Sequence, residues 1–356
     1  MIPLKETFHP ERNTQPSRGS QNGRRRVAEL ELELGEPPVA ERDLGWPRIT
    51  VVTAVYNGSA HLEETICSLL DQRYPNLEYI VVDDGSTDRT PEIIKKYEKH
   101  LEWRRQENAG MYTALNAGFR EASGEILGWL NDSDKLHTGA LLAVGSVFRS
   151  LPEVEWITGR PTWFNEEGMT VAVGEPPHWS RYRFLAGANR YIQQESTFWR
   201  RSLWEKAGGY VDDSGRWGHV ADFELWVRFF RHAKLYPVDA LMGGFRKDKN
   251  SRGLQNLRRC HEIHERIVDE ELKRIRFGKY WRMAIQIARR AQANAKGRKL
   301  WRRLVTDNLY KRPGRDWAPV IRYEGDRWVL ARNVSESSWW GSASWPIGRS
   351  SPACKS

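Results

Sequence analysis

The 356-residue sequence has few cysteines and no long apolar run. Its three cysteines, Cys67, Cys260 and Cys354, lie far apart and form no CxxC pair, which argues against a zinc module and against a disulfide scaffold. No stretch approaches the ~18 consecutive apolar residues of a membrane-spanning helix. Residues 1–22 lack the apolar core that is typical of a secretory signal peptide. We therefore expect a protein of the reducing cytosol rather than a secreted or integral membrane protein.

Basic charge is concentrated in the C-terminal part of the chain. Residues 1–250 hold 32 Lys and Arg against 36 Asp and Glu, a net charge of −4, whereas residues 251–356 hold 24 against 10, a net charge of +14. No acidic residue lies between Glu271 and Asp307, and apolar residues in this interval fall near one helical face. A basic amphipathic helix of this kind can bind an anionic membrane surface, here through residues 272–304. It can equally pack its apolar stripe on the rest of the protein.

Membrane binding and packing on the rest of the protein both stay open as roles of this helix. They place the protein in the cytoplasm, either free or peripheral on the inner face of the membrane. Nucleic acid is disfavoured as a partner, because the charge is suitable but the sequence carries no recognition motif.

Strand and helix patterns alternate from Arg48 onward. Apolar or β-branched runs at Ile49–Val55, Tyr79–Val82 and Ile126–Leu130 are typical of buried strands. Between the first two, residues 62–70 place apolar side chains at the spacing of one helical face. This alternation predicts an α/β fold with a mostly parallel sheet and helices on both faces.

The same patterns divide the chain into four parts. Residues 1–47 are polar and rich in Pro and Gly, and are expected to be a poorly ordered arm. Residues 48–250 form the α/β domain, and residues 251–305 are predicted to be a basic helical region. Residues 306–356 are rich in Trp, Ser and Gly without a clear period, and are expected to be a tail of low order.

Polar side chains follow three of the predicted strands. Tyr56-Asn57 follows the first, Asp83-Asp84 the second, and Asp132-Ser133-Asp134 the strand that begins at Ile126. Ligands of open parallel sheets bind beyond the carboxyl ends of the strands, so we predict a binding site there. Carboxylates at such a place can hold Mg²⁺ or Mn²⁺, although the same residues also suit a tight turn.

Several motifs share their order with one known family. They are Thr50-Val-Val-Thr-Ala-Val-Tyr-Asn57, Val81-Val-Asp-Asp-Gly-Ser-Thr-Asp88, Gly124-Glu125 through Asp134, Gln194-Glu-Ser-Thr-Phe198, Gly208-Gly-Tyr210 and Asp222-Phe-Glu-Leu-Trp226. Over roughly Arg48 to Arg246 the chain resembles a family 2 glycosyltransferase with the GT-A fold. Members of that family are inverting enzymes that use nucleotide-sugar donors with a divalent cation. The resemblance implies a hexosyltransferase with a glycan or lipid-linked acceptor, in cell-surface polysaccharide or glycolipid synthesis.

The resemblance also implies roles for individual residues. Asp222 would be the catalytic base, and Asp132 and Asp134 would bind Mn²⁺ or Mg²⁺. Gln194 and Glu195 would bind the acceptor. The donor, with a UDP- or dTDP-sugar favoured, would be held by Thr53, Tyr56, Asn57, Asp84, Asn116 and Asp132.

Elementary chemistry agrees with these residue types. A hard cation held by carboxylates suits the departure of a nucleoside diphosphate. A carboxylate such as that of Asp84 can accept from a pyrimidine ring N–H. A general base that takes the acceptor's proton is worth roughly 10²–10⁴-fold in rate. Asp222 fits that role, while Glu224, two residues on, points to a different helical face.

The sequence departs from the family pattern in two places. Ser133 fills the slot that is usually the metal-binding Asp, and Asp248 stands where His is expected. The first departure leaves open a different class of function, a non-catalytic nucleotide-sugar or glycan-binding protein on the same fold. A nucleotidyltransferase is disfavoured, because no Gly-rich phosphate loop follows the first strand, where the sequence is Ala54-Val-Tyr-Asn57.

Overall fold

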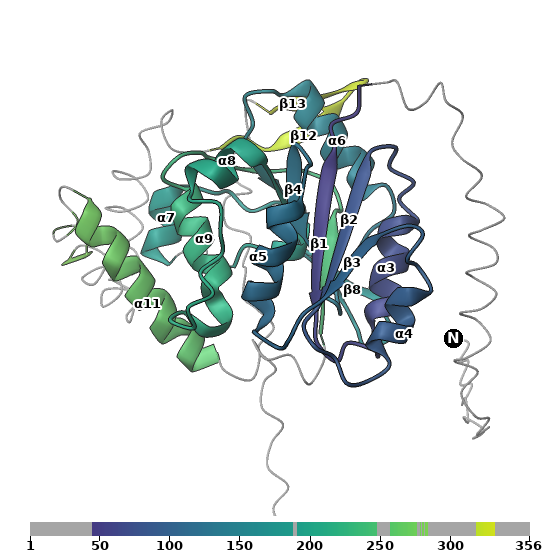
Figure 1. The fold of residues 1–356 in the computed structure, drawn as a ribbon. Helices are drawn as coiled ribbons and strands as arrows, with labels where there is room; N and C mark the ends of the chain where they lie inside the picture. The colour runs from purple at the N-terminus through teal and green to yellow at the C-terminus, as the bar shows by residue number, and fades with distance from the viewer. Residues whose placement is uncertain are drawn as a thin grey trace, which may run out of the picture. The chain divides into compact units, whose positions relative to one another are not determined.

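A seven-stranded sheet forms the centre of the fold (Figure 1). The computed structural model describes residues 45–187, 191–247, 257–275 and 318–331, together with Gly278, Tyr280, Arg282 and Met283. The strand order is β10-β6-β9-β4-β1-β2-β3, and all strands run parallel except β9. The strands span β1 (Ile49–Val55), β2 (Leu77–Asp83), β3 (Glu102–Arg105), β4 (Ile126–Trp129), β6 (Trp156–Thr158), β9 (Thr197–Arg200) and β10 (Leu235–Pro237).

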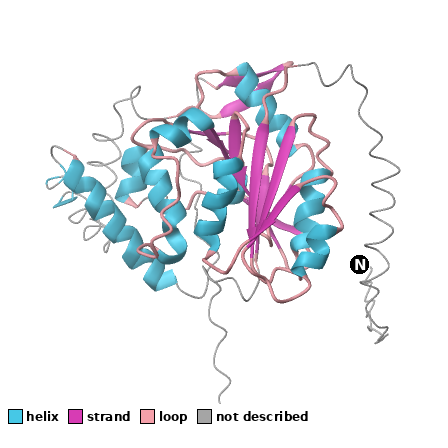
Figure 2. Ribbon diagram, in the orientation of Figure 1, coloured by secondary structure: helices cyan, strands magenta, loops and turns pink. Residues whose placement is uncertain are grey.

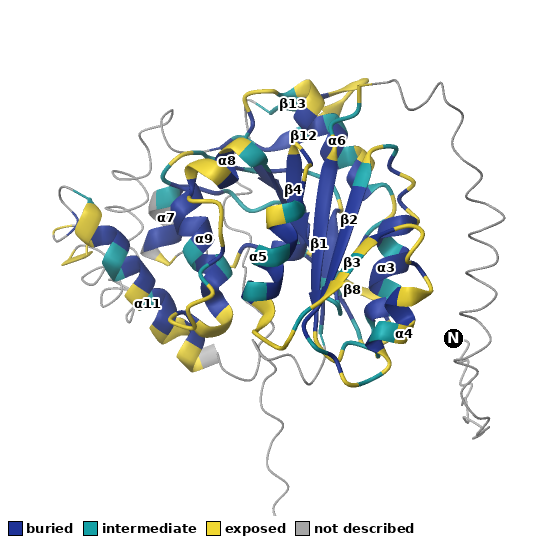
Figure 3. Cartoon of the chain, viewed as in Figure 1, coloured by how far each residue is buried: buried dark blue, intermediate teal, exposed yellow. Residues whose placement is uncertain are grey.

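The sheet is covered by helices on both sides, as the alternating sequence pattern predicts (Figure 2). Every residue of β1 is buried, which explains its unbroken run of apolar and β-branched residues (Figure 3). Helices α5 (Met111–Glu121) and α9 (Ala221–Phe229) share one apolar cluster with Val52 and Val82 of the sheet. Helices α3 (Leu62–Leu70) and α4 (Thr90–Lys95) lie on the opposite side of β1 and β2 from α5 in Figure 1. The remaining helices are α6 (Ala140–Ser150), α7 (Arg181–Ala186) and α8 (Arg201–Lys206).

A second, smaller sheet connects distant parts of the chain. Its order is β5-β11-β7-β8, formed by β5 (Lys135–Leu136), β11 (Gly243–Arg246), β7 (Thr162–Phe164) and β8 (Thr170–Val173). Since β5 follows directly on the turn after β4, this sheet brings β11 against the predicted metal-binding motif.

Tryptophans supply much of the interior. Trp129 and Trp226 stack with their ring centroids 5.6 Å apart and their planes at 8°. Trp156 and Trp199 are fully buried beside them. Their role is therefore packing, because none of these four rings has a face open to a sugar.

The described part of the basic region belongs to the same core. Helix α11 (Leu257–Arg274) packs on α9 and buries five apolar residues in the central cluster: Cys260, Ile263, Ile267, Val268 and Leu272. Glu271, 2% exposed, accepts hydrogen bonds from Arg181 (2.6 Å) and Arg231 (2.9 and 2.6 Å). Leu272, the first residue of the proposed membrane-binding stripe, thus faces the protein. Apart from scattered positions up to Met283, the rest of residues 272–304 lies outside the described residues, and the membrane interaction stays a prediction.

None of the helices in the described part of the chain is long and apolar enough to cross a membrane.

The expectation of low order from residue 306 onward is wrong for residues 318–331. Strands β12 (Ile321–Glu324) and β13 (Arg327–Leu330) form an antiparallel hairpin around Gly325, which has φ +68°. Ile321 is fully buried and pairs with Val238, next to β10. A short strand of alternating apolar and charged residues gives a weak sequence signal, and only the contacts of the hairpin with Val238 and α6 show what it buries.

Because α11 completes the core, we expect that a chain ending after residue 256 will not fold. Burying a large apolar side chain stabilises by about 1.5–3 kcal/mol, so the loss of Ile263, Ile267, Val268 and Leu272 rivals the whole stability of a domain, about 5–15 kcal/mol. A chain ending after residue 331 keeps α11 and the hairpin, and serves as the control. Thermal melting and solubility of the two forms show whether the domain folds without α11. Equal melting temperatures would show instead that α11 is an appendage.

Candidate active site

The loops after β1 and β2 are fastened together at the carboxyl edge of the sheet. The backbone N–H of Asn57 donates to Oγ of Ser86 (2.9 Å). The side-chain oxygen of Asn57 accepts from the backbone N–H of Thr87 (2.8 Å) and of Asp88 (3.3 Å). Asn57 has φ +54°, a left-handed conformation that Asn tolerates better than most residues. Asn57 therefore shapes this edge, whatever else it contacts.

Tyr56 and Thr53 differ in their exposure to solvent. Tyr56, directly after β1, is 40% exposed and can meet a ligand. Thr53 is fully buried, and its hydroxyl accepts a hydrogen bond from the Tyr79 hydroxyl (3.2 Å). The structure thus places Thr53 beneath the edge, and direct contact of Thr53 with a donor stays a prediction.

The two acids at the carboxyl end of β2, Asp83 and Asp84, hold loops in place. Asp83 accepts from the backbone N–H of Ser86 (2.9 Å) and so caps the turn. Asp84, 2% exposed, accepts from Gln106 (2.7 Å) and from the backbone N–H groups of Ala109 (3.0 Å) and Gly110 (2.8 Å). The carboxylate of Asp84 therefore fixes the loop that precedes α5, and a contact with a pyrimidine base remains only a prediction.

Asn116 also has a different place from the predicted one. Its side-chain amide exchanges hydrogen bonds with the backbone of Val211, 2.7 Å to the carbonyl and 2.8 Å from the N–H. A second contact reaches Asp213 (3.2 Å). Asn116 thus fastens α5 to the segment before α9, and its donor-binding role is not supported.

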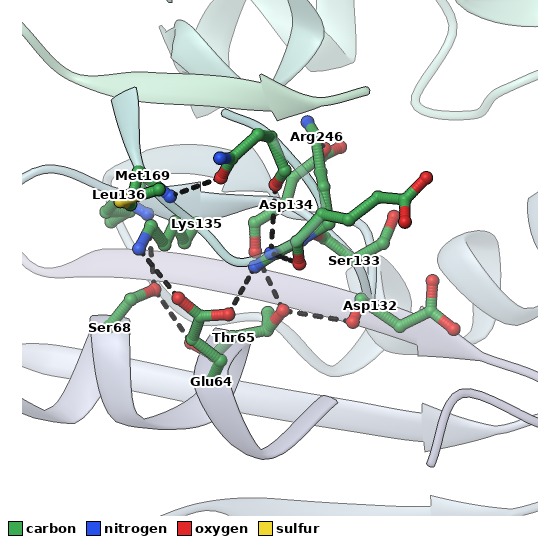
Figure 4. Close-up of polar contacts among 12 residues, drawn as sticks. Glu64, Thr65, Ser68, Asp132, Ser133, Asp134, Lys135, Leu136, Met169 and Arg246 are labelled. Carbon is green, nitrogen blue, oxygen red and sulfur yellow. Dashed lines mark hydrogen bonds and ion pairs between the residues drawn. The ribbon is translucent and has the colours of Figure 1, made fainter. Parts of the chain in front are cut away.

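Asp134 is held in the interior of the smaller sheet (Figure 4). It is 1% exposed, and one carboxylate oxygen accepts from the backbone N–H of Arg246 (2.8 Å) while the other accepts from Asn131 (3.0 Å). Burial raises the pKa of Asp134 despite these hydrogen bonds. Both oxygens are thus engaged by protein groups, which gives Asp134 a structural role here, and binding of a metal by Asp134 stays a prediction.

Arg246 holds the turn that contains Ser133 and Asp134, a role that the sequence did not predict. The guanidinium is 1% exposed and donates to the carbonyls of Ser133 (2.7 Å) and Glu166 (2.8 Å). It also pairs with Glu64 of α3. Lys135 binds the other oxygen of Glu64 (2.7 Å), and these two cations hold the pKa of Glu64 below its usual value in spite of burial. A lone Arg at the end of an apolar strand is the only sequence signal for this role.

Asp132 points away from Asp134 and Arg246 (Figure 4). It is half-buried, and its carboxylate lies so close to Gly58 that a Cβ at that position would come within 2.3 Å of Oδ2. Glycine at position 58 therefore lets the β1 loop approach this acid. Among the described residues no three acidic, His or Cys side chains gather into a ready-made metal site. Asp132 is the one carboxylate of the motif directed toward the strand-end edge.

Asp222 lies in the first turn of α9, beside the start of α5. The backbone N–H of Ala221 donates to the hydroxyl of Tyr112, the second residue of α5 (3.2 Å). Burial raises the pKa of Asp222 to about 6, although backbone N–H groups of its own turn favour the charged form. Glu224, the alternative base, is instead paired with Arg228 (2.9 Å). Burial raises the pKa of Glu224 as well, so it is the ion pair of Glu224 with Arg228 that distinguishes it from Asp222.

Gln194 and Glu195 occupy the short helix η1 (Gln194–Ser196), which contacts β4, β5 and β11. Gln194 donates to the carbonyl of Trp129, but its side-chain oxygen and Oε1 of Glu195 have no hydrogen-bond partner among the described residues. Burial, and then the charges of Asp134 and Asp222, raise the pKa of Glu195 well above its usual value. Glu195 is thus a buried acid close to these two groups, and acceptor binding by Gln194 and Glu195 stays a prediction. Asp248, where the family often has His, lies outside the described residues.

Comparison with known proteins gives one consistent result. Residues 50–146 match the family model described as glycosyl transferase family 2. An uncharacterised glycosyltransferase of Rickettsia prowazekii (strain Madrid E) is 27% identical over 195 residues, 53% of this chain and 61% of the relative. A poly-β-1,6-N-acetyl-D-glucosamine synthase of Staphylococcus epidermidis is 28% identical over 193 residues, 50% of this chain and 47% of the relative. The chain thus spans about half to three fifths of the length of these relatives.

The fold is shared with solved structures. The crystal structure of S. aureus TarS 1–349 in complex with UDP-GlcNAc has a TM-score of 0.55 and 17% sequence identity, with 67% of this chain and 70% of that chain covered. The GT-A fold expected from the sequence is therefore confirmed.

Proposed function

We propose, from the family 2 glycosyltransferase domain that this chain carries, that the protein transfers a sugar from a nucleotide-sugar donor to a hydroxyl of a glycan or lipid-linked acceptor. The observation that supports this proposal most is Asp222, a half-buried acid beside the strand-end edge, whose pKa is raised to about 6 by desolvation. Synthesis of a cell-surface polysaccharide is the context that we favour, in keeping with the name of the S. epidermidis relative.

The proposed chemistry is a single displacement. The Asp222 carboxylate removes the proton from the acceptor hydroxyl as that oxygen bonds to the anomeric carbon, and the bond from this carbon to the diphosphate breaks. Attack from the face opposite the leaving group inverts the anomeric configuration. A base with a pKa of about 6 is mostly ionised at neutral pH and still binds a proton well, which is the compromise that general-base catalysis needs.

The donor would lie over the fastened loops after β1 and β2. Tyr56 offers an exposed ring for the nucleotide base. Asp84 and Asn57 keep the surrounding loops in shape through the hydrogen bonds described above. A UDP- or dTDP-sugar remains the donor that we favour.

A divalent cation fits this site only in part. Mg²⁺ or Mn²⁺ is often held by one or two carboxylates together with substrate phosphates and water. Asp132 is the residue that would hold it, while Asp134 and Ser133 are engaged with Arg246. When bound, the cation would neutralise charge on the departing diphosphate.

Separate substitutions of Asp132 and Asp134 distinguish a metal-binding role from a structural one. We expect Asp132→Asn to weaken Mn²⁺-dependent donor binding about tenfold or more and to leave the melting temperature nearly unchanged. Asp134→Asn should instead lower the melting temperature, because its buried hydrogen bonds to Arg246 and Asn131 are disturbed, and should spare the Mn²⁺ dependence. Calorimetric titration with donor, with and without Mn²⁺, checks both. The reverse pattern would restore Asp134 as the ligand.

A direct test of the function is release of nucleoside diphosphate from a panel of nucleotide sugars, with Mn²⁺ and with chelator. Donors are first selected by thermal shift, since a bound ligand stabilises the folded state. Metal-dependent release supports an enzyme. Binding of a donor without any release favours the alternative, a non-catalytic nucleotide-sugar or glycan-binding protein. This alternative rests on Ser133, which stands where the family usually has a metal-binding Asp.

A further inference from the structure

The start of α9 has no side-chain cap from the residues next to it in sequence. The N-cap residue Val220 makes no side-chain hydrogen bond to the first turn. The hydroxyl oxygen of Tyr112, from α5, accepts from the backbone N–H of Ala221 (3.2 Å). This phenol is 8% exposed, so the contact is enclosed by protein. A residue 109 positions away thus satisfies an amide that a local cap would otherwise have to satisfy.

Helix α11 closes the other side of the same turn. The ring of His264 stacks on Phe223, the residue after Asp222, with centroids 4.1 Å apart. Cys260, one helical turn earlier, is 9% exposed and lies in the cluster that contains Phe223. Both residues lie outside the segment that matches the family model, which ends at residue 146.

We propose that Tyr112 is a positioning residue for Asp222, and that Cys260 and His264 complete the wall of protein that shields the half-buried Asp222 carboxyl from much of the surrounding water. This inference rests on the proposed function, in which Asp222 is the base. The groups that face Asp222 are the phenol of Tyr112 from α5, the thiol of Cys260 from α11 and the carboxyl of Glu195 from η1. Burial, followed by the charge of Asp222, raises the pKa of both Tyr112 and Cys260, so both stay neutral at physiological pH.

Two substitutions change the polarity around the Asp222 carboxyl in opposite directions. Tyr112→Phe removes a polar group near the carboxyl and the acceptor for Ala221, so turnover should fall about tenfold, as small misplacements of a catalytic group do. The acidic limb of the pH–rate profile should move to higher pH. Cys260→Ser places a more polar atom in the wall, so the limb should move to lower pH. Tyr74→Phe is the matched control, because the Tyr74 hydroxyl is bound to the carbonyl of Pro47 (2.7 Å) away from the site.

A double-mutant cycle shows whether Tyr112 acts through Asp222. In the Asp222→Asn background, Tyr112→Phe should cost no further turnover, whereas a purely structural role would lower turnover in both backgrounds. Donor binding and melting temperature are measured on each variant, and Cys260→Ser carries the test if Tyr112→Phe does not fold. Unmoved pH limbs in Tyr112→Phe and Cys260→Ser would overturn this inference alone. Full turnover in Asp222→Asn would overturn the assignment of the base.

Discussion

Replacing Asp222 by Asn is expected to lower turnover by about 10²–10⁴-fold while donor affinity stays within about twofold of the parent. The amide cannot accept the proton, but it keeps the shape of the side chain and its place in the first turn of α9. Turnover is measured under donor saturation, and donor affinity by calorimetry on the same preparations.

Glu224→Gln provides the control on the same helix. Glu224 is paired with Arg228, so its loss should lower stability and leave the chemical step unchanged. If Glu224→Gln loses turnover and Asp222→Asn does not, the base has been assigned to the wrong acid.

Replacing Arg246 by Met is expected to destabilise the fold by about 3–5 kcal/mol, the usual cost of removing one partner from a buried ion pair. The loss leaves Glu64 paired with Lys135 alone and removes the guanidinium donor from the carbonyls of Ser133 and Glu166. Denaturant unfolding of the parent and the variant measures the change. Because Arg246 also holds the turn that carries Asp132, donor binding should weaken in the folded fraction.

Arg258→Met is the matched control for that experiment. Arg258 is 95% exposed and pairs with Glu262 within one turn of α11 (3.3 Å). Exposed pairs of this kind contribute about 0.3–0.5 kcal/mol. Similar losses in the two variants would mean that Arg246 is no more than another surface cation.

The sequence predicted the features that local pattern controls. The runs at β1, β2 and β4 are buried on both faces, and the carboxyl ends of parallel strands must meet at one edge. The approach of Asn57 to the loop after β2 follows from that topology. Asp222 could be placed because a helix start is visible in the sequence and the family resemblance supplied its role.

The contacts that the sequence did not predict join residues that are distant along the chain. Asp134 is turned inward by Arg246, 112 residues further along the chain, and Asn116 by Val211, 95 residues away. Nothing near either residue in sequence signals these partners. The sequence showed an apolar stripe only from Leu272 onward, and a stripe that meets a membrane looks like one that packs on the protein until the fold is known.

The pH dependence of nucleoside diphosphate release tests the central claim most directly. Since Asp222 must be ionised to act, the rate in saturating Mn²⁺ should fall about tenfold per pH unit below an apparent pKa close to 6, and this limb should be absent from Asp222→Asn. The measurement needs only donor and water, because water can replace the acceptor hydroxyl. An identical acidic limb in the parent and in Asp222→Asn would contradict the account.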